Sequence, residues 1–447
     1  MNTPRQRRRG GVWWLSPVTV ALIVIPAAVL PTALIPDASF RAQWRTPKAI
    51  TLETCLLFLC AGLVLALGAL LVAAARPVRP RAGRWPALGP DEVLLMRRCS
   101  TVLVVLTAVG YLAFVVAAVR GGVGLADVTA TVGPEGLYGA GIKERIGTIP
   151  GVTTLTQFGL AAVVVSSVLL CNEFSRRELG KLAVMVGLAL PRAFLLTERL
   201  AILELVVPVV VVIACRFGTA GKGRVMVRFL PALAAPVLLA VFAAFEYSRS
   251  WLYFKETTGE GNFLRFVTER LAGYYTTAMN NGQLEMLYAN PPGRWPYVTL
   301  EALWTAPGAA DIDLYESLSG QQLPDYMAML ERYGNPEFSN GSGVAPVFID
   351  YGSVGGLLYF LVVGVVAGLL YRGFRESSSV GMLLYPVLFI GLLELPRYLH
   401  WAQGRALPSF LALALIGYLM RRQVRSHPTV AGRIPAPAPP HTVGGPP

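Results

Sequence analysis

Residues 227–254 read VRFLPALAAPVLLAVFAAFEYSRSWLYF, and within them an apolar chain turns polar. Residues 227–245 supply about the 20 apolar residues that a helix needs to cross the hydrocarbon core of a bilayer. From Glu246 the sequence stays polar and aromatic as far as Tyr351, and every other gap between apolar stretches is shorter. The chain is therefore expected to cross a membrane several times and to keep one large hydrophilic loop, residues 247–351.

The composition agrees with a membrane protein. Of 447 residues, 54% are hydrophobic and only 15% are charged, whereas about a quarter of the residues of a soluble domain are charged. Ten apolar stretches predict ten transmembrane helices, at residues 13–35, 52–75, 100–119, 152–171, 179–193, 200–215, 227–245, 354–371, 380–395 and 406–420. The fifth and sixth are short and flank the polar residues 197–199, so a broken or re-entrant pair is an alternative. The expected fold class is an all-α polytopic membrane protein.

The positive charge indicates an orientation. A net charge of +13 on a soluble protein would suggest nucleic acid, but more than half of the 39 basic residues here precede the first span or follow an even-numbered one. Cytoplasmic loops carry such an excess of Lys and Arg. We therefore expect a plasma (cytoplasmic) membrane protein with both termini in the cytoplasm, the loop 247–351 outside, and no nucleic-acid partner.

The predicted organisation has four parts. Residues 1–12 form a cytoplasmic N-terminus, residues 13–425 the transmembrane domain with the outer loop 247–351 inside it, and residues 426–447 a Pro-rich cytoplasmic tail that is expected to be disordered. The five cysteines lie in or beside the spans, and the three histidines are scattered. Neither set has the spacing of a metal site or a disulfide framework, so no metal and no cofactor are predicted.

Charged residues gather where spans are expected to reach the outer face. Placing a charged side chain within the bilayer costs a few kcal/mol, so such side chains usually form pairs or mark a site. The set is Arg192, Glu198, Arg199, Glu204, Glu246, Arg249, Glu394, Arg397, His400 and Arg405. Ion pairing, for example of Arg199 with Glu198 or Glu204, would explain them structurally. Alternatively, guanidinium groups bind diphosphate through paired hydrogen bonds.

The outer loop is expected to hold two helices. Apolar residues at helical spacing over 263–279 predict an amphipathic helix on the membrane surface, and a second helix is expected near residues 325–333. A second outer segment, residues 120–151, is rich in glycine and faces the same side, so the two segments could form one site.

Three short motifs resemble a known family. Residues 340–356 read NGSGVAPVFIDYGSVGG, residues 148–156 read TIPGVTTLT, and residues 270–281 read RLAGYYTTAMNN. The first is similar to the D-[FY]-G-x-x-G segment by which O-antigen polymerases and other oligosaccharide repeat unit polymerases re-enter the membrane, and a turn is expected at residues 350–352, at the end of the long loop. The related ligases and polymerases carry a His before this segment, at a place where this chain has Gly341.

The resemblance implies a GT-C-like, metal-independent glycosyltransferase. Such a polysaccharide polymerase joins polyprenyl-diphosphate-linked oligosaccharide repeat units on the outer face of the membrane. Its partners would be that lipid-linked oligosaccharide, membrane lipid, a chain-length regulator and a flippase. The alternatives are a lipid-linked sugar flippase or transporter, an O-antigen-ligase-like transferase that differs only in its acceptor, and a non-catalytic scaffold.

The same resemblance assigns roles to residues. The expected diphosphate-binding residues are Arg192, Arg199, Arg249, Arg270, Arg397 and Arg405. The candidates for orienting or deprotonating the acceptor are Asp350, Glu246 and His400. The expected sugar-binding residues are Tyr274, Tyr275, Asn280 and Asn281.

Overall fold

The computed structural model describes most of the chain. The described residues are 11–76, 78, 85–124, 126–127, 145, 149, 151–195, 200–218, 223–251, 254–256, 261–288, 295–322 and 324–426. The predicted N-terminus and Pro-rich tail, most of the glycine-rich segment 120–151, and Glu198 with Arg199 therefore lie outside the description.

A helix occupies every stretch that was predicted to span the membrane. These helices are α1 (Pro17–Leu34), α3 (Leu52–Ala75), α4 (Pro90–Arg120), α7 (Phe158–Asn172), α8 (Arg176–Leu195), α9 (Leu200–Gly218), α10 (Gly223–Glu246), α16 (Ala345–Arg375), α17 (Ser379–Glu394) and α18 (Leu407–Ser426). Six segments of the described chain are long and apolar enough to cross a membrane: α1, α3, α4, α10, α16 and the segment Thr153–Asn172 that contains α7. A helical multi-pass membrane protein is thereby supported, while the number of ten spans stays a prediction.

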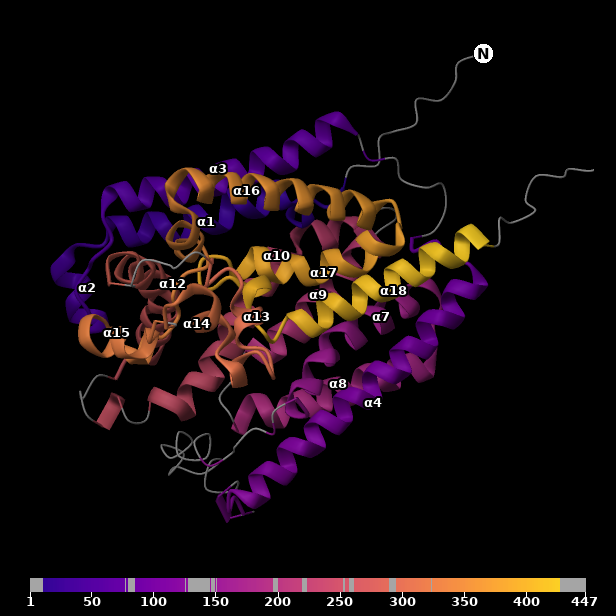
Figure 1. The fold of residues 1–447 in the computed structure, drawn as a ribbon, viewed down its shortest axis with the longest axis horizontal. Coiled ribbons are helices and arrows are strands. Elements are labelled where there is room, and N and C mark those ends of the chain that lie inside the picture. The colour runs from indigo at the N-terminus through magenta and orange to yellow at the C-terminus, as the bar shows by residue number, and fades with distance from the viewer. Residues whose placement is uncertain are drawn as a thin grey trace, which may run out of the picture.

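Small residues let the helices approach closely. Helices α1, α3 and α16 lie side by side along one edge of the molecule (Figure 1). A methyl group added at Gly364 of α16 would lie only 2.1 Å from the carbonyl oxygen of Leu65 in α3, so the two backbones touch at this point. Helix α17 is the most enclosed, with almost every residue from Gly381 to Leu392 buried.

The loops that carry the basic residues meet at one end of the molecule. The indole nitrogen of Trp14 donates to the Val227 carbonyl over 2.8 Å, and that of Trp85 donates to the Phe374 carbonyl over 2.8 Å. The segments before α1, before α4, near the start of α10 and at the end of α16 are thus neighbours, as the alternating charge requires. Which side of a membrane this end faces remains a prediction.

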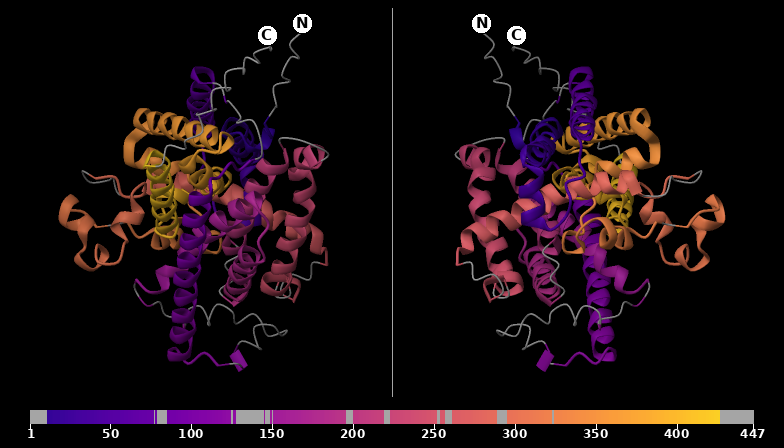
Figure 2. Two further views of the ribbon diagram at one scale, coloured as in Figure 1. Left: turned by 90° about the vertical axis from the view of Figure 1, so that its right-hand side faces the viewer. Right: turned by 90° about the vertical axis from the view of Figure 1, so that its left-hand side faces the viewer.

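The long loop folds at the opposite end, where α2 (Asp37–Trp44), α12 (Phe263–Tyr288) and α15 (Tyr326–Tyr333) gather (Figure 1). It also contains α13 (Glu301–Trp304) and α14 (Leu314–Ser319), and its orange part projects to one side of the bundle (Figure 2). Helix α15 confirms the second predicted helix, and the Asp325 side chain caps it by accepting from the Ala328 backbone N–H over 3.0 Å.

Helix α12 confirms the first predicted helix and corrects its environment. It extends nine residues beyond the predicted end at Met279, and residues 276–285 are all buried. A helix lying on a membrane surface keeps one face in water, so this part of α12 is instead enclosed by protein. Its polar side chains were missed as interior groups because they resemble a solvated face in the sequence.

The predicted turn at residues 350–352 is present. Helix α16 is interrupted at Gly352, where φ is 68° and ψ is −179°. Residues with a side chain rarely adopt this φ, but glycine adopts it readily. The interruption separates a short helix that belongs to the outer loop from the apolar helix that follows it.

Candidate functional site

The end of the long loop is fastened to the connection between α17 and α18. The backbone N–H of Gly343 donates to the Leu395 carbonyl over 2.9 Å, and Ser342 forms a parallel bridge with Tyr398. A methyl group on Gly343 would lie 2.5 Å from the Tyr398 carbonyl, so glycine is needed for this close approach. Two segments that are distant in sequence, both rich in candidate residues, therefore form one site.

One part of this site is the group His400, Glu204 and Arg405. The Glu204 Oε1 atom lies 3.3 Å from His400 Nε2 and 3.5 Å from Arg405 Nε. The His400 side chain is fully buried, and neither of its ring nitrogens has a hydrogen-bond partner within the described chain. Buried polar atoms are normally paired, so these three side chains form a charged group that is held in place but incompletely satisfied.

A second part of the site surrounds Arg397. Its Nη1 atom pairs with Glu394 Oε2 at 2.8 Å, and its Nη2 atom lies 3.5 Å from Asn340 Oδ1. Its guanidinium lies 5.6 Å from the ring centre of Tyr274 and 6.0 Å from that of Tyr275. Aromatic faces attract such a cation. The Nε atom has no hydrogen-bond partner among the residues the structure describes.

Tyr398 joins the two parts. The guanidinium of Arg405 lies 4.8 Å from the centre of its ring and that of Arg397 lies 5.8 Å away. Arg192 is joined to the same region through the segment before α7. Its Nη1 atom donates to Thr156 Oγ1 over 3.3 Å, and the carbonyl of the next residue, Gln157, accepts from Ser409 Oγ over 2.6 Å, four residues after Arg405. Three of the six predicted diphosphate-binding arginines and one predicted catalytic residue thus belong to one site. We name it the outer arginine site: Arg192, Glu204, Arg397, Tyr398, His400 and Arg405.

Arg270 and Glu246 lie in a different arrangement. Arg270 pairs with Glu337 at 2.5 Å and with Glu246 at 3.5 Å, and its guanidinium lies 4.8 Å from the ring centre of Phe338. Two carboxylates therefore neutralise this arginine, and the contact fastens α12 to the end of α10. The arrangement explains both residues as structural, although their predicted roles in diphosphate binding and catalysis stay predictions.

Asp350 holds the loop that precedes α13. Its two oxygens accept from the backbone N–H groups of Tyr297, Val298 and Thr299 at 2.8–3.4 Å, and from the Thr299 hydroxyl at 2.6 Å. A carboxylate with four donors is well satisfied. The predicted catalytic Asp350 therefore has a complete structural role in this conformation.

The predicted sugar-binding asparagines are also engaged. Asn280 accepts from the backbone N–H groups of Ala49 and Ile50 and donates to the Pro47 carbonyl over 2.9 Å. Asn281 donates to the carbonyls of Phe338 and Asn340. They attach α12 to the segment before α3 and to the end of the loop, whereas Tyr274 and Tyr275 face Arg397.

The remaining predicted residues cannot be placed. Arg199 lies outside the described residues, and Arg249 lies in the π-helical turn Tyr247–Trp251, of which its side chain is not described. Within the described chain, no group of three or more His, Cys, Asp or Glu side chains could hold a metal ion.

Two acidic residues were not predicted as site residues. Glu204, in the apolar helix α9, was among the charges expected at the span ends, but no binding or catalytic role was predicted for it. Glu285, on α12, is 8% exposed, and burial followed by the charges of Asp350 and Glu301 raises its pKa to about 8. The sequence does not distinguish Glu285 from a solvated residue of an amphipathic helix.

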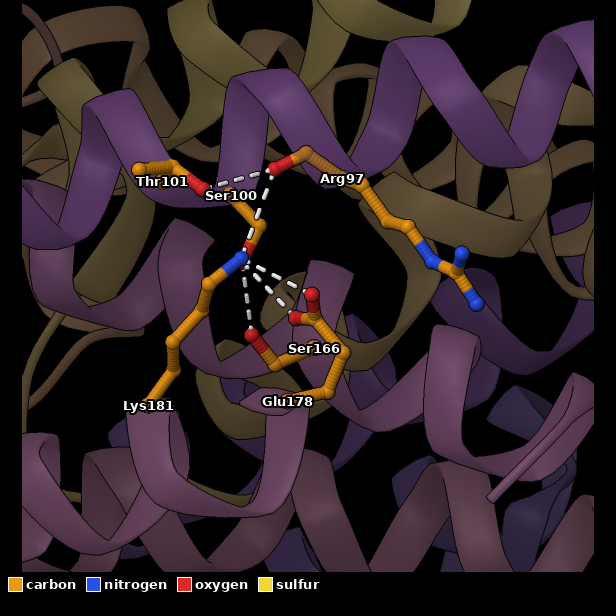
Figure 3. A network of polar contacts seen from close by, with 6 residues as sticks. All are labelled: Arg97, Ser100, Thr101, Ser166, Glu178 and Lys181. Carbon is orange, nitrogen blue, oxygen red and sulfur yellow. Dashed lines mark hydrogen bonds and ion pairs between the residues drawn. The ribbon is translucent and has the colours of Figure 1, made fainter. Parts of the chain in front are cut away.

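A buried charged group at the opposite end shows a different pattern (Figure 3). Lys181 Nζ donates to Glu178 Oε1 over 2.8 Å and to Ser100 Oγ over 3.3 Å, while Ser100 Oγ also lies 3.1 Å from Glu178 Oε2 and 2.8 Å from Ser166 Oγ. We name it the inner lysine network. Every polar atom of its side chains has a partner, so the network is explained by packing α8 against α4 and α7.

Two cavities lie away from the outer arginine site. One, of about 190 Å³, is lined by Asp91, Leu95, Arg98 and Gln423, and another, of about 260 Å³, lies between α7, α8 and α9. Neither includes a residue of the outer arginine site. We base the assignment on converging charged groups rather than on these hollows, because unsatisfied buried charge is the stronger indication of a ligand.

Comparison with protein-family models, with curated proteins and with solved structures finds no match for this chain.

Proposed function

We propose that this protein is an integral membrane polysaccharide polymerase that joins polyprenyl-diphosphate-linked oligosaccharide repeat units on the outer face of the membrane. The observation that carries the proposal is the convergence of Arg397, Arg405 and His400 where the long loop returns to the helices. Two guanidinium groups whose Nε atoms make no hydrogen bond within the described chain suit an anion with several oxygens, such as a diphosphate.

The chemistry follows from this arrangement. A hydroxyl oxygen of the acceptor sugar forms a bond to the anomeric carbon of the donor, and the bond from that carbon to the diphosphate oxygen breaks. The hydroxyl proton leaves to a base, and the electron pair stays on the polyprenyl diphosphate. Negative charge thus develops on the leaving group, where preorganised arginines stabilise it most.

Tyrosine rings support a sugar ligand beside the arginines. Tyr274, Tyr275 and Tyr398 surround the Arg397 guanidinium, and aromatic rings combine an apolar face with a hydroxyl group. His400 is a candidate base, since an imidazole nitrogen is the most common proton acceptor in enzyme sites. Its pairing with Glu204 fixes the position of the ring.

The test uses a strain that lacks the gene and carries a plasmid copy. We expect Arg397→Gln with Arg405→Gln to abolish long polymer and to accumulate single lipid-linked repeat units on the outer leaflet. Arg265→Gln is the matched control, because Arg265 is exposed and pairs with Glu269 one turn along its own helix. Polymer of unchanged yield and length in the double variant would overturn the proposal.

The alternatives predict other outcomes of the same experiment. Accumulation of repeat units on the inner leaflet would indicate a flippase. Normal polymer that is not transferred to its final acceptor would indicate a ligase. Either result would replace the polymerase assignment, because a polymerase acts after translocation and before final transfer.

A further inference from the structure

The cavity between α7, α8 and α9 has no role in the proposed chemistry. Its volume is about 260 Å³, and most of its wall is apolar, with Leu170 of α7, Leu182 of α8 and Val209 of α9 among the lining residues. An apolar cavity of roughly 150 Å³ is enough to bind benzene. The space between these helices therefore has room for a stretch of hydrocarbon chain.

One hydroxyl group in this wall is buried without a partner. Ser167 of α7 lines the cavity and is 2% exposed, and its Oγ atom makes no hydrogen bond within the described chain. The preceding residue, Ser166, is just as buried, but its Oγ atom lies 2.8 Å from Ser100 Oγ in the inner lysine network (Figure 3). Two adjacent serines thus differ in their pairing, and the unpaired one lines the cavity. Because a buried hydroxyl without a hydrogen bond costs free energy, Ser167 indicates a ligand with a polar atom.

The lining also contains a cation. Arg216 lies in the last turn of α9, and within the described chain no carboxylate lines the cavity with it. Near the end of a membrane-spanning helix, an arginine extends its charged group to the level of the lipid headgroups. Its planar guanidinium binds phosphate oxygens through two parallel hydrogen bonds. The lining therefore suits a ligand that combines an anionic group with a hydrocarbon chain.

The cavity lies at the surface of the bundle, near the end where the basic loops meet. Ile213 and Phe217 of α9 line it and are 41% and 52% exposed, and α7 belongs to a segment that is long and apolar enough to cross a membrane. A methyl group on Gly218, at the end of α9, would collide with the side chain of Val12 in the segment before α1. A lipid from the surrounding bilayer can therefore reach the cavity from the side.

We propose that this cavity binds one glycerophospholipid with a net negative headgroup. Three features of the lining match three parts of such a lipid: Arg216 binds the phosphate, the Ser167 hydroxyl donates to an ester carbonyl, and the apolar wall encloses part of an acyl chain. Basic pockets between transmembrane helices bind anionic lipid headgroups in other membrane proteins. The bound lipid joins α7, α8 and α9. This inference is independent of the polymerase assignment, because it involves neither the outer arginine site nor the transfer reaction.

The first test measures lipid binding by the full chain. The purified protein in a non-ionic detergent is titrated with dioleoyl phosphatidylglycerol, and native mass spectrometry gives the dissociation constant of the first bound lipid. We expect Arg216→Gln to weaken this binding about tenfold, as for the loss of a hydrogen bond to a charged group. Arg97→Gln is the matched control and should bind like the wild type, because the Arg97 side chain is 45% exposed, pairs with Glu173 at 3.6 Å and does not line the cavity.

Two further probes separate the parts of the lipid. Dioleoyl phosphatidylcholine carries a trimethylammonium group that cancels the charge of its phosphate, so we expect it to bind several-fold more weakly than the phosphatidylglycerol. Glycerol 3-phosphate has the anionic group without acyl chains and should not compete. Equal affinity for the two lipids, competition by glycerol 3-phosphate, or unchanged binding by Arg216→Gln would overturn the proposal.

A second test covers the case in which Arg216→Gln does not fold. Thermal unfolding is followed for Ser167→Ala and Ser166→Ala, with and without phosphatidylglycerol. Without lipid we expect Ser167→Ala to unfold at or above the wild-type temperature, because it removes an unpaired buried hydroxyl, and to be stabilised less than the wild type when lipid is added. Ser166→Ala should unfold at a lower temperature in both conditions, because it breaks the pairing with Ser100.

The two serine variants give a result that a merely structural Ser167 would not. If Ser167→Ala without lipid loses as much stability as Ser166→Ala, the hydroxyl has a partner in the protein and the proposal is wrong. If added lipid stabilises Ser167→Ala as much as the wild type, the hydroxyl does not contact the lipid, and the proposal is equally wrong.

Discussion

The outer arginine site and the inner lysine network contain similar groups in opposite states. Both bury carboxylates beside cations among helices, at opposite ends of the bundle. In the inner network the lysine, the glutamate and two serines satisfy one another completely. In the outer site the His400 nitrogens and the Nε atoms of Arg397 and Arg405 make no hydrogen bond within the described chain, although His400 Nε2 and Arg405 Nε form ion pairs with Glu204. On this difference rests the proposal that the inner network holds helices together and the outer site receives a ligand.

The physical reason is the cost of unpaired buried polar groups. Each such group costs about 1–3 kcal/mol, so a chain keeps several of them at one place only where something else satisfies them. Completeness of pairing is therefore a more informative criterion than charge. By that criterion Asp350, Asn280 and Asn281 belong with the inner network. Arg270 is intermediate, because its Nε atom makes no hydrogen bond within the described chain but its guanidinium forms ion pairs with Glu246 and Glu337.

The largest expected effect concerns the inner network. Lys181→Met leaves Glu178, which is 2% exposed, without its cation. We expect a loss of about 3–5 kcal/mol in the free energy of unfolding, as for other broken buried pairs. This loss is measured by adding SDS to the protein in mixed detergent micelles and following its unfolding. Glu178→Gln with Lys181→Met should recover much of the loss, and a single variant as stable as wild type would break the comparison.

The next effect concerns the outer site. We expect Arg405→Gln to lower the polymerisation rate by about 10²–10³-fold, by analogy with the loss of one preorganised donor. Its unfolding free energy should change little, because the Arg405 side chain is 37% exposed and Glu204 keeps its contact with His400 when Arg405 is replaced. A rate assay with purified lipid-linked repeat units is compared with the SDS titration. A variant that loses stability instead of rate would place Arg405 among the structural groups.

A pH titration sharpens the position of Glu285 between these two classes. Because its pKa is raised to about 8 from an ordinary value near 4.5, the folded chain holds this proton more tightly than the unfolded chain. The contribution of Glu285 to the free energy of unfolding is thus favourable below about pH 4.5. It declines as the pH rises to 8, by at most about 1.4 kcal/mol per pH unit. We expect Glu285→Gln to flatten this decline. If the unfolding free energies of the wild type and the variant change in parallel with pH, this expectation is wrong.

The smallest effect concerns the pairing of Arg270. Glu337 is 50% exposed, and Arg270 keeps Glu246 when Glu337 is neutralised. We expect Glu337→Gln to cost under about 1 kcal/mol, as for other exposed pairs, and to leave the polymerisation rate unchanged. A large drop in rate at constant stability would move Arg270 from the structural groups to the outer arginine site.

Much of the architecture could be predicted from the sequence. Apolar stretches long enough to cross a bilayer predicted a helix at each of ten places, because a backbone surrounded by lipid must satisfy its own hydrogen bonds. The turn at Gly352 and helix α15 followed from local signals, a glycine and a capping aspartate. The buried centre of α12 did not, because its spacing of polar and apolar residues is the same whether its polar face meets water or protein.

The candidate site divides in the same way. Arg192, Arg397, His400 and Arg405 were predicted from charges at the ends of apolar stretches, since such charges are costly wherever the chain goes. Their pairing with Glu204 and the burial of Glu285 depend on contacts between segments far apart in sequence. No local pattern specifies whether a neighbouring helix brings a donor or leaves a group unpaired.

The sequence by itself thus determined that this is a helical multi-pass membrane protein with one large loop and charged span ends. The tertiary structure alone decided which of those charges are satisfied. Hydrophobicity and helix formation act within a segment, so the sequence encodes them directly. Hydrogen-bond satisfaction depends on the groups that other segments bring within about 3 Å, so only the folded chain separates the outer arginine site from the inner lysine network.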